Sequence, residues 1–246
     1  MPPVDSHVHL SDYPDPDREV SMSARMKLTL LAVSIDKDTS LRSLELARKH
    51  PQTVKAFVGV HPSEATKTES LDWSAKALHE ATGCGEIGLD PKYSECGPGS
   101  PQARVYETML ELAEKAGKPV QVHSRDAENA CLQALKRYAP PRVLFHWFEK
   151  EELLREVMDR GYYLSFGPAL LYSKKLQRIA ASSERSLVLT ESDGPITFGP
   201  LGGVGGPALV PSVIFELARV WKLRFEEAGE VLFRNHDRYT GGGRKG

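Results

Sequence analysis

Eight short apolar runs, separated by longer stretches of helical character, constrain the fold of this chain more than any other feature of its sequence. Several runs, such as LTLLAV at 28–33 and SLVLT at 186–190, are apolar throughout, as expected of strands that are covered on both faces. The predicted strands are Val4–Leu10, Met26–Ile35, Lys55–His61, Gly83–Asp90, Lys118–Ser124, Arg142–Phe148, Gly161–Gly167 and Ser186–Asp193.

Helix-length segments connect these runs and follow the last of them. The predicted helices are Thr39–His50, Leu71–Thr82, Gln102–Ala116, Ala127–Tyr138, Lys150–Arg160, Ala169–Ser182, Pro207–Trp221 and Phe225–Phe233. Eight strands joined by helical crossovers predict an α/β fold, a closed parallel (β/α)8 TIM barrel that forms one domain over residues 1–246. We expect Gly199–Pro207 to be a flexible surface loop and the last six residues, from Gly241, to be a disordered tail.

Composition narrows the class of protein. The formal net charge of −1 provides no general attraction to nucleic acid or anionic membranes, so a polyanion would need a local binding patch. This weakens a nuclease interpretation without excluding it. The chain has three cysteines, an odd number, and none of them forms a CxxC motif. This pattern favours reduced thiols and a cytoplasmic location. No secretory signal, no apolar run of membrane-spanning length and no obligatory protein partner is evident.

Side chains that can bind metal stand at or near the ends of five predicted strands. The carboxyl ends of barrel strands meet at one mouth, where active sites lie. Alternation along an extended strand places both imidazoles of His7-Val8-His9 on one face of the strand. The same alternation predicts that Cys84 and Glu86 lie on one face of the fourth strand. The complete set is His7, His9, Glu86, His123, His146 and Asp193.

Each of these residues is a weak signal alone, but their joint placement on five strands predicts a metal centre. Four imidazoles and two carboxylates suit zinc, manganese or magnesium better than calcium, which prefers oxygen alone. Six ligands exceed what one catalytic zinc ion uses, whereas two divalent metal ions that share a carboxylate would use them all. Such a pair activates water for hydrolysis. A further histidine, His61 in GVHP, ends the third strand and is expected to face the substrate as a donor.

The chain resembles the TatD-type deoxyribonucleases, a branch of the amidohydrolase-like metal-dependent hydrolases. The resemblance runs nearly end to end. The motifs that carry it are DSHVHL at 5–10, GVHP at 59–62, GEIGLD at 85–90, PVQVHSRDA at 119–127, LFHWF at 144–148, TESDGP at 190–195 and NHDRY at 235–239.

The resemblance implies roles for individual residues. His7, His9 and Asp193 would hold one metal ion. His123 and His146 would hold the second, and Glu86 would bridge the two. Asp193 would also accept a proton from the attacking water, which makes Asp193 and Glu86 the catalytic pair. His61 and Arg125 match residues that meet a phosphate. Glu191 is expected to support the barrel or the ligands, and Asn235 and Arg238 to anchor the closing helix.

The sequence departs from the family pattern mainly after His146, where Trp147 stands in place of a smaller residue. Our leading hypothesis is hydrolysis of DNA phosphodiester bonds, with single strands or free ends favoured as substrate and with Lys92 and Lys150 as candidate backbone contacts. A small-molecule amide, ester or lactone hydrolase is the alternative. A metal-binding interaction protein without catalysis is a third possibility, which the intact ligand set disfavours.

Overall fold

The computed structural model, which describes residues 1–242, contains all eight predicted strands in one parallel sheet, ordered as in the chain. The strands are β1 (Val4–Val8), β2 (Thr29–Ala32), β3 (Val54–Val58), β4 (Gly83–Gly88), β5 (Val120–His123), β6 (Val143–Phe145), β7 (Tyr163–Phe166) and β8 (Val188–Thr190). The sheet curls into a nearly closed barrel because β8 returns to β1. The Thr190 hydroxyl donates to the Val4 carbonyl at 2.7 Å, and the Asp193 N–H donates to the His7 carbonyl at 2.9 Å.

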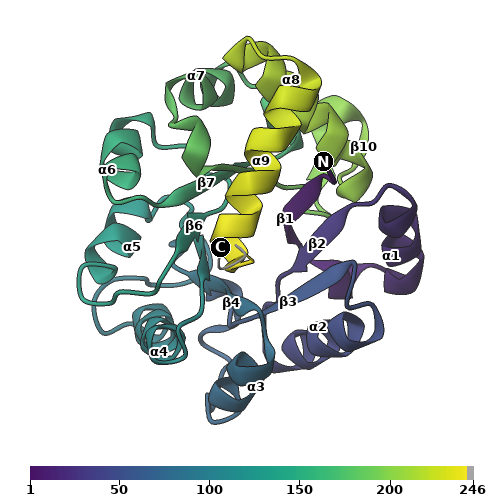
Figure 1. Cartoon of the computed structure of the whole chain (residues 1–246). Helices are drawn as coiled ribbons and strands as arrows, with labels where there is room; N and C mark the ends of the chain where they lie inside the picture. Colours follow the sequence, from purple (N-terminus) through teal and green to yellow (C-terminus); the bar gives the residue numbers. More distant parts are fainter. Residues whose placement is uncertain (243–246) are drawn as a thin grey trace.

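Helices surround the barrel, except α9, which crosses one end of it, as Figure 1 shows. They are α1 (Pro16–Arg25), α2 (Lys37–Lys49), α3 (Ser74–Glu80), α4 (Pro101–Lys115), α5 (Glu128–Ala134), α6 (Leu154–Asp159), α7 (Lys174–Ser182), α8 (Val210–Trp221) and α9 (Phe225–Thr240). The strands are shorter than predicted, so several expected ligands stand on the loops that follow them. No helix among residues 1–242 has the length and apolar character required to cross a bilayer.

Helix α1 was not predicted. Its start carries clear local signals, because the Asp15 carboxylate accepts the Arg18 N–H at 3.0 Å and Pro16 occupies the first turn. Only Pro16, Val20 and Ser23 of this helix are buried. The apolar stripe is therefore too narrow to produce the periodicity by which the other helices were predicted.

The segment after β8 is more ordered than the flexible loop we predicted for Gly199–Pro207. An antiparallel hairpin forms there from β9 (Thr197–Phe198) and β10 (Gly203–Val204). Phe198 is 2% exposed, and a side chain at Gly205 would collide with its ring. The Tyr13 hydroxyl donates to the Gly205 carbonyl at 3.3 Å. Residues 199–204 are exposed, as predicted for a surface loop, but the segment contains a hairpin because its glycines permit a close approach to the Phe198 ring.

Helix α9 crosses the ring of strands in Figure 1 and closes that end of the barrel. Its Asn235 amide donates to the carbonyls of Arg185 and Val188, both at 2.7 Å, just before and within β8. Tyr239 enters the barrel, where its ring stacks on Phe57 with centroids 6.1 Å apart and its hydroxyl donates to the Val120 carbonyl at 2.9 Å. The interior apolar cluster comprises Leu31, Val33, Phe57, Leu144, Tyr163, Leu189 and Tyr239.

The prediction that Cys84 and Glu86 lie on the same face of β4 was wrong. Cys84 is fully buried with its sulfur 3.9 Å from the Met109 carbonyl of α4, so it faces the helix layer rather than the barrel interior. The pairing register of β4 and β5 shifts between Cys84 and Ile87. That irregularity breaks the strict alternation of side chains and lets Glu86 point inward although Cys84 points outward.

The predicted tail begins at Gly241, which ends α9 in a left-handed conformation with φ 80°. The Gly242 N–H donates to the Asp237 carbonyl at 2.9 Å. The remaining part of the predicted tail, residues 243–246, lies outside the described residues.

Tyr239→Ala should reduce the free energy of unfolding by about 3–5 kcal/mol, because it empties the position that the ring fills in the barrel. Tyr239→Phe keeps the packing and loses only the hydrogen bond to Val120, so it should cost about 1 kcal/mol. Equilibrium denaturation in urea would measure both. A loss below 1 kcal/mol for the alanine variant would show that α9 is not needed to close the barrel.

Candidate metal centre

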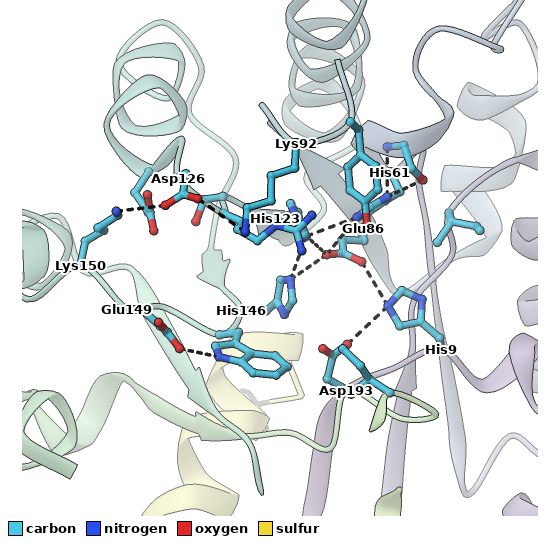
Figure 2. A pocket seen from close by; sticks show the side chains of 18 of the residues that line it. His9, His61, Glu86, Lys92, His123, Asp126, His146, Glu149, Lys150 and Asp193 are labelled. Atoms are coloured by element: carbon cyan, nitrogen blue, oxygen red, sulfur yellow. Dashed lines mark hydrogen bonds and ion pairs between the residues drawn. The ribbon is translucent and has the colours of Figure 1, made fainter. Parts of the chain in front are cut away.

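The carboxylate of Glu86 lies at the barrel mouth among imidazoles, of which Figure 2 shows His9, His123 and His146. Its Oε1 is 2.7 Å from both His123 Nδ1 and His146 Nε2. Its Oε2 is 3.3 Å from His9 Nε2 and 3.5 Å from His7 Nε2. Each carboxylate oxygen therefore faces its own pair of histidines, the arrangement that a shared ligand requires.

Asp193 completes the site from the loop after β8. Its Oδ1 is 3.6 Å from His7 Nε2 and 3.5 Å from His9 Nε2. The backbone at Asp193 has φ 50°, a left-handed conformation that non-glycine residues adopt rarely and that recurs at functional sites. The structure thus brings the six predicted ligand side chains together at one mouth.

Gln121 determines which nitrogen of His7 faces the site. The Gln121 amide nitrogen donates to the Ser6 carbonyl at 2.8 Å, so its oxygen is the atom that lies 2.7 Å from His7 Nδ1. An amide oxygen only accepts, so Nδ1 carries the ring proton. The lone pair of His7 Nε2 is therefore free to face Glu86 and Asp193, as in a histidine prepared for metal binding.

Asp90, which is not among the predicted site residues, performs the same task for His123. Its Oδ2 lies 2.8 Å from His123 Nε2 and 2.7 Å from Arg125 Nη2. Gln102 holds the Asp90 backbone, accepting from its N–H and donating to its carbonyl, both at 2.8 Å. An acidic residue at a strand end is a weak sequence signal. Asp90 could have been suspected only because GEIGLD and HSR bring an acid, an imidazole and a guanidinium to neighbouring strand ends.

Three buried atoms of the six site residues have no hydrogen-bond partner, which tests whether the site suits a metal. His146 Nδ1 is turned toward Glu191, 3.8 Å away, and the other two are His7 Nε2 and Glu86 Oε2. A buried polar atom without a partner is unfavourable by about 1–3 kcal/mol, and more when it is charged. Both atoms face inward at the mouth, and a mixed set of nitrogen and oxygen donors suits zinc, manganese or magnesium. The residues present therefore fit divalent cations.

The pKa values of the site residues also support the conclusion that the site suits divalent cations. Burial alone would raise the pKa of Glu86, but the imidazoles of His146, His7 and His123 hold that pKa well below its usual range. Burial would lower the pKa of His123, yet Glu86 and Asp90 raise it to about 9. The carboxylates thus demand positive charge at this place, which protons supply when metal ions do not.

His61 lies beside the centre, and its ring proton is placed differently from that of His7. Its Nε2 is 3.3 Å from His123 Nδ1 and 3.9 Å from Glu86 Oε1, close enough to join a ligand group with them. However, the Ser63 N–H donates to His61 Nδ1 at 3.2 Å. A backbone N–H can only donate, so the ring proton is on Nε2. Burial lowers the pKa of His61 to about 3. His61 is therefore a neutral N–H donor directed at the centre.

A cavity of about 700 Å³ opens above these residues. Arg125 lies at its rim, with its guanidinium over the ring of Tyr93 at 5.2 Å. The lysines of the rim are paired, because Lys150 and Lys92 lie 3.3 and 4.0 Å from the Asp126 carboxylate. Figure 2 shows Lys150, Asp126 and Lys92 in a row along one side of the cavity. The rim therefore offers local cations without a continuous basic groove.

Comparisons with known proteins agree with this geometry. A family model described as TatD related DNase matches residues 4–241. The metal-dependent hydrolase YabD of Bacillus subtilis, itself uncharacterised, is 28% identical, covering 95% of this chain and 97% of that protein. Deoxyribonuclease TATDN3 of Homo sapiens is 27% identical, covering 94% and 92%. The crystal structure of YjjV, a TatD homologue from Escherichia coli, superposes with a TM-score of 0.83 at 24% identity over 96% and 97% of the two chains.

The fold and the site together define a metal-dependent hydrolase on a TIM-like barrel. Within that class, the chain belongs to the TatD-related DNase family.

Asp90→Asn should weaken binding of Mn²⁺ or Zn²⁺ about 10–100-fold, because the hydrogen bond that orients His123 loses its charge. Isothermal titration calorimetry on the metal-stripped protein would measure this. Asp17→Asn is a matched control, since Asp17 forms only a surface ion pair with Lys49 and His50 and should leave the affinity unchanged. Equal affinities in the two variants would remove Asp90 from the account.

Proposed function

We propose that this protein is a deoxyribonuclease that hydrolyses phosphodiester bonds of DNA with the help of two divalent ions, zinc, magnesium or manganese. The observation that carries the proposal is the pair of donors beside the centre, the neutral His61 N–H and the Arg125 guanidinium. Both lie against Tyr93, His61 in a T-shaped arrangement with ring centroids 5.4 Å apart and Arg125 over the ring face. Two fixed donors on one side of a cationic site suit an anionic, oxygen-rich group such as a phosphodiester.

In this proposal His7, His9 and Asp193 hold one ion, His123 and His146 hold the other, and Glu86 lies between them. Bound ions would neutralise the phosphate charge and make a water molecule acidic enough to attack at neutral pH. Burial would raise the pKa of Asp193, but the hydrogen bond from His9 and the nearby imidazoles lower it. Asp193 is then an ionised carboxylate at the cavity edge, able to accept the proton of the attacking water.

The volume of the cavity and the charges at its rim favour single-stranded ends of DNA over a continuous duplex. A cavity of about 700 Å³ with paired rim charges suits an unpaired end better than a continuous duplex, which would need a longer basic surface. Relatives named as deoxyribonucleases, human TATDN3 and Tat-D of Schizosaccharomyces pombe, support DNA as the substrate class. We also propose a cytoplasmic location, in keeping with three unpaired cysteines.

The balanced rim favours a second candidate, a small-molecule amide, ester or lactone hydrolase. Lys175 lies 3.6 Å from Glu149, so this rim cation also has an acidic partner. A small neutral substrate would need no excess of positive charge. The same metal centre could polarise its carbonyl oxygen.

Glu86→Gln and Asp193→Asn should each lower hydrolysis at least about 100-fold, because one loses the shared carboxylate and the other the proton acceptor. The assay is cleavage of an end-labelled single-stranded oligonucleotide with added Mn²⁺ or Mg²⁺. Retention of the wild-type rate in either variant would show that the site is misassigned.

The same protein should be offered a duplex with blunt ends and a panel of esters, amides and lactones. We expect single strands to be cleaved faster than the blunt duplex. Intact oligonucleotides together with metal-dependent turnover of the panel would replace the nuclease proposal with the second candidate. Asp17→Asn again serves as the folded, fully active control, because its surface ion pair lies outside the cavity.

A further inference from the structure

Trp147 lies in an unusual position for the residue that follows an inward-facing histidine. Alternation along a strand would send its side chain outward, opposite to His146. The backbone at Trp147 instead has φ 44°, in the left-handed region that bulky residues rarely adopt. Its N–H donates to Glu191 Oε1 at 3.1 Å, which anchors this turn. As a result, both His146 and Trp147 line the cavity above the centre.

The indole is held firmly from behind. Its Nε1–H donates to Glu149 Oε1 at 2.9 Å. Its ring stacks on Phe198 of β9, with centroids 5.5 Å apart and planes 18° apart. Phe198 is buried and does not line the cavity, so it covers the face of the indole that is turned away from the cavity. The hairpin that contains Phe198 thereby fixes the orientation of Trp147.

The cavity side of the indole is unoccupied by any comparable group. Among residues 1–242, no second aromatic ring and no guanidinium lies over Trp147. Tyr93 is different, because Arg125 already covers its face. Pro195 and Ile196 add apolar surface to the cavity wall. Trp147 is thus a rigid aromatic ring, supported on one face, beside the metal centre.

We propose that Trp147 is the stacking platform for the nucleobase of the nucleotide whose phosphate is cleaved. The proposal rests on the proposed function, since it needs a nucleic acid in the cavity. Trp147 directly follows His146, whose Nε2 is 2.7 Å from Glu86 Oε1, and a single sugar separates a base from its phosphate. Every nucleobase has a flat π face, so such a platform binds bases with little sequence preference.

The test compares an oligothymidylate with the same oligomer carrying abasic residues at the cleaved end. Wild-type protein should show a KM about tenfold or more lower for the strand with bases, as stacking on an aromatic ring predicts. Trp147→Leu should abolish this preference, whereas Trp147→Phe should retain most of it. Tyr172→Leu is a control, because this exposed tyrosine does not line the cavity and its loss should leave the preference for bases intact.

A binding measurement separates this inference from the nuclease activity. In the Asp193→Asn background, the strand with bases should quench tryptophan fluorescence more than the abasic strand. The quenching should disappear in Trp147→Phe, which removes the indole. Trp73 and Trp221 remain as internal references, since neither lines the cavity.

Each outcome has a defined meaning. Cleavage of DNA with equal KM for both strands overturns the platform and leaves the nuclease proposal standing. If the wild-type protein cleaves no DNA, the nuclease proposal fails and the assignment of Trp147 to the cleaved nucleotide fails with it, even where base-dependent quenching shows that the indole stacks on bases. Absence of both overturns both. Should Trp147→Leu fail to fold, Phe198→Leu removes the supporting ring and should reduce the preference for bases, and an unchanged preference would count against the platform.

Discussion

The structure depends on one electrostatic constraint, the burial of the Glu86 carboxylate among imidazoles at the barrel mouth. Removing a carboxylate from water costs several kcal/mol unless opposite charge and hydrogen bonds compensate. Here one oxygen of Glu86 meets His123 and His146 at 2.7 Å, and the other has no hydrogen-bond partner. The surrounding residues leave a buried carboxylate oxygen that favours positive charge, from a proton or from a metal ion. The hydrolytic chemistry follows from this requirement for positive charge.

The second layer of the site makes the histidines suitable for metal. Gln121 fixes the ring proton of His7, and Asp90 accepts from His123 on the side away from Glu86. Asp90 also binds Arg125, so the same carboxylate orients a candidate ligand and a candidate substrate contact. Burial lowers the pKa of His61 and of His146 alike, but the Ser63 N–H places the ring proton of His61 on Nε2, the nitrogen that faces the site. The site therefore combines histidines that present lone pairs with donors that present hydrogens.

The fold and the grouping of the six side chains could be predicted because both follow from periodicity. Strand ends of a parallel barrel converge, so residues such as His7 and Asp193 could be placed together without coordinates. Their roles as metal ligands remain a prediction. Features that depend on local departures from periodicity were not predicted from the sequence. The narrow buried stripe of α1, the outward turn of Cys84 and the left-handed backbone at Trp147 all break the regular pattern. The role of Asp90 in orienting His123 was not predicted, because it depends only on neighbours from other strands.

The most direct test of the central claim is the anomalous diffraction of crystals soaked in Mn²⁺, measured at the manganese absorption edge. We predict two peaks, one on each side of the Glu86 carboxylate, about 3.5–4 Å apart as in other two-metal sites. One peak would mark an ion bound by His7, His9 and Asp193, and the other an ion bound by His123 and His146. A single peak remote from Glu86, or no peak at the barrel mouth, would contradict the account.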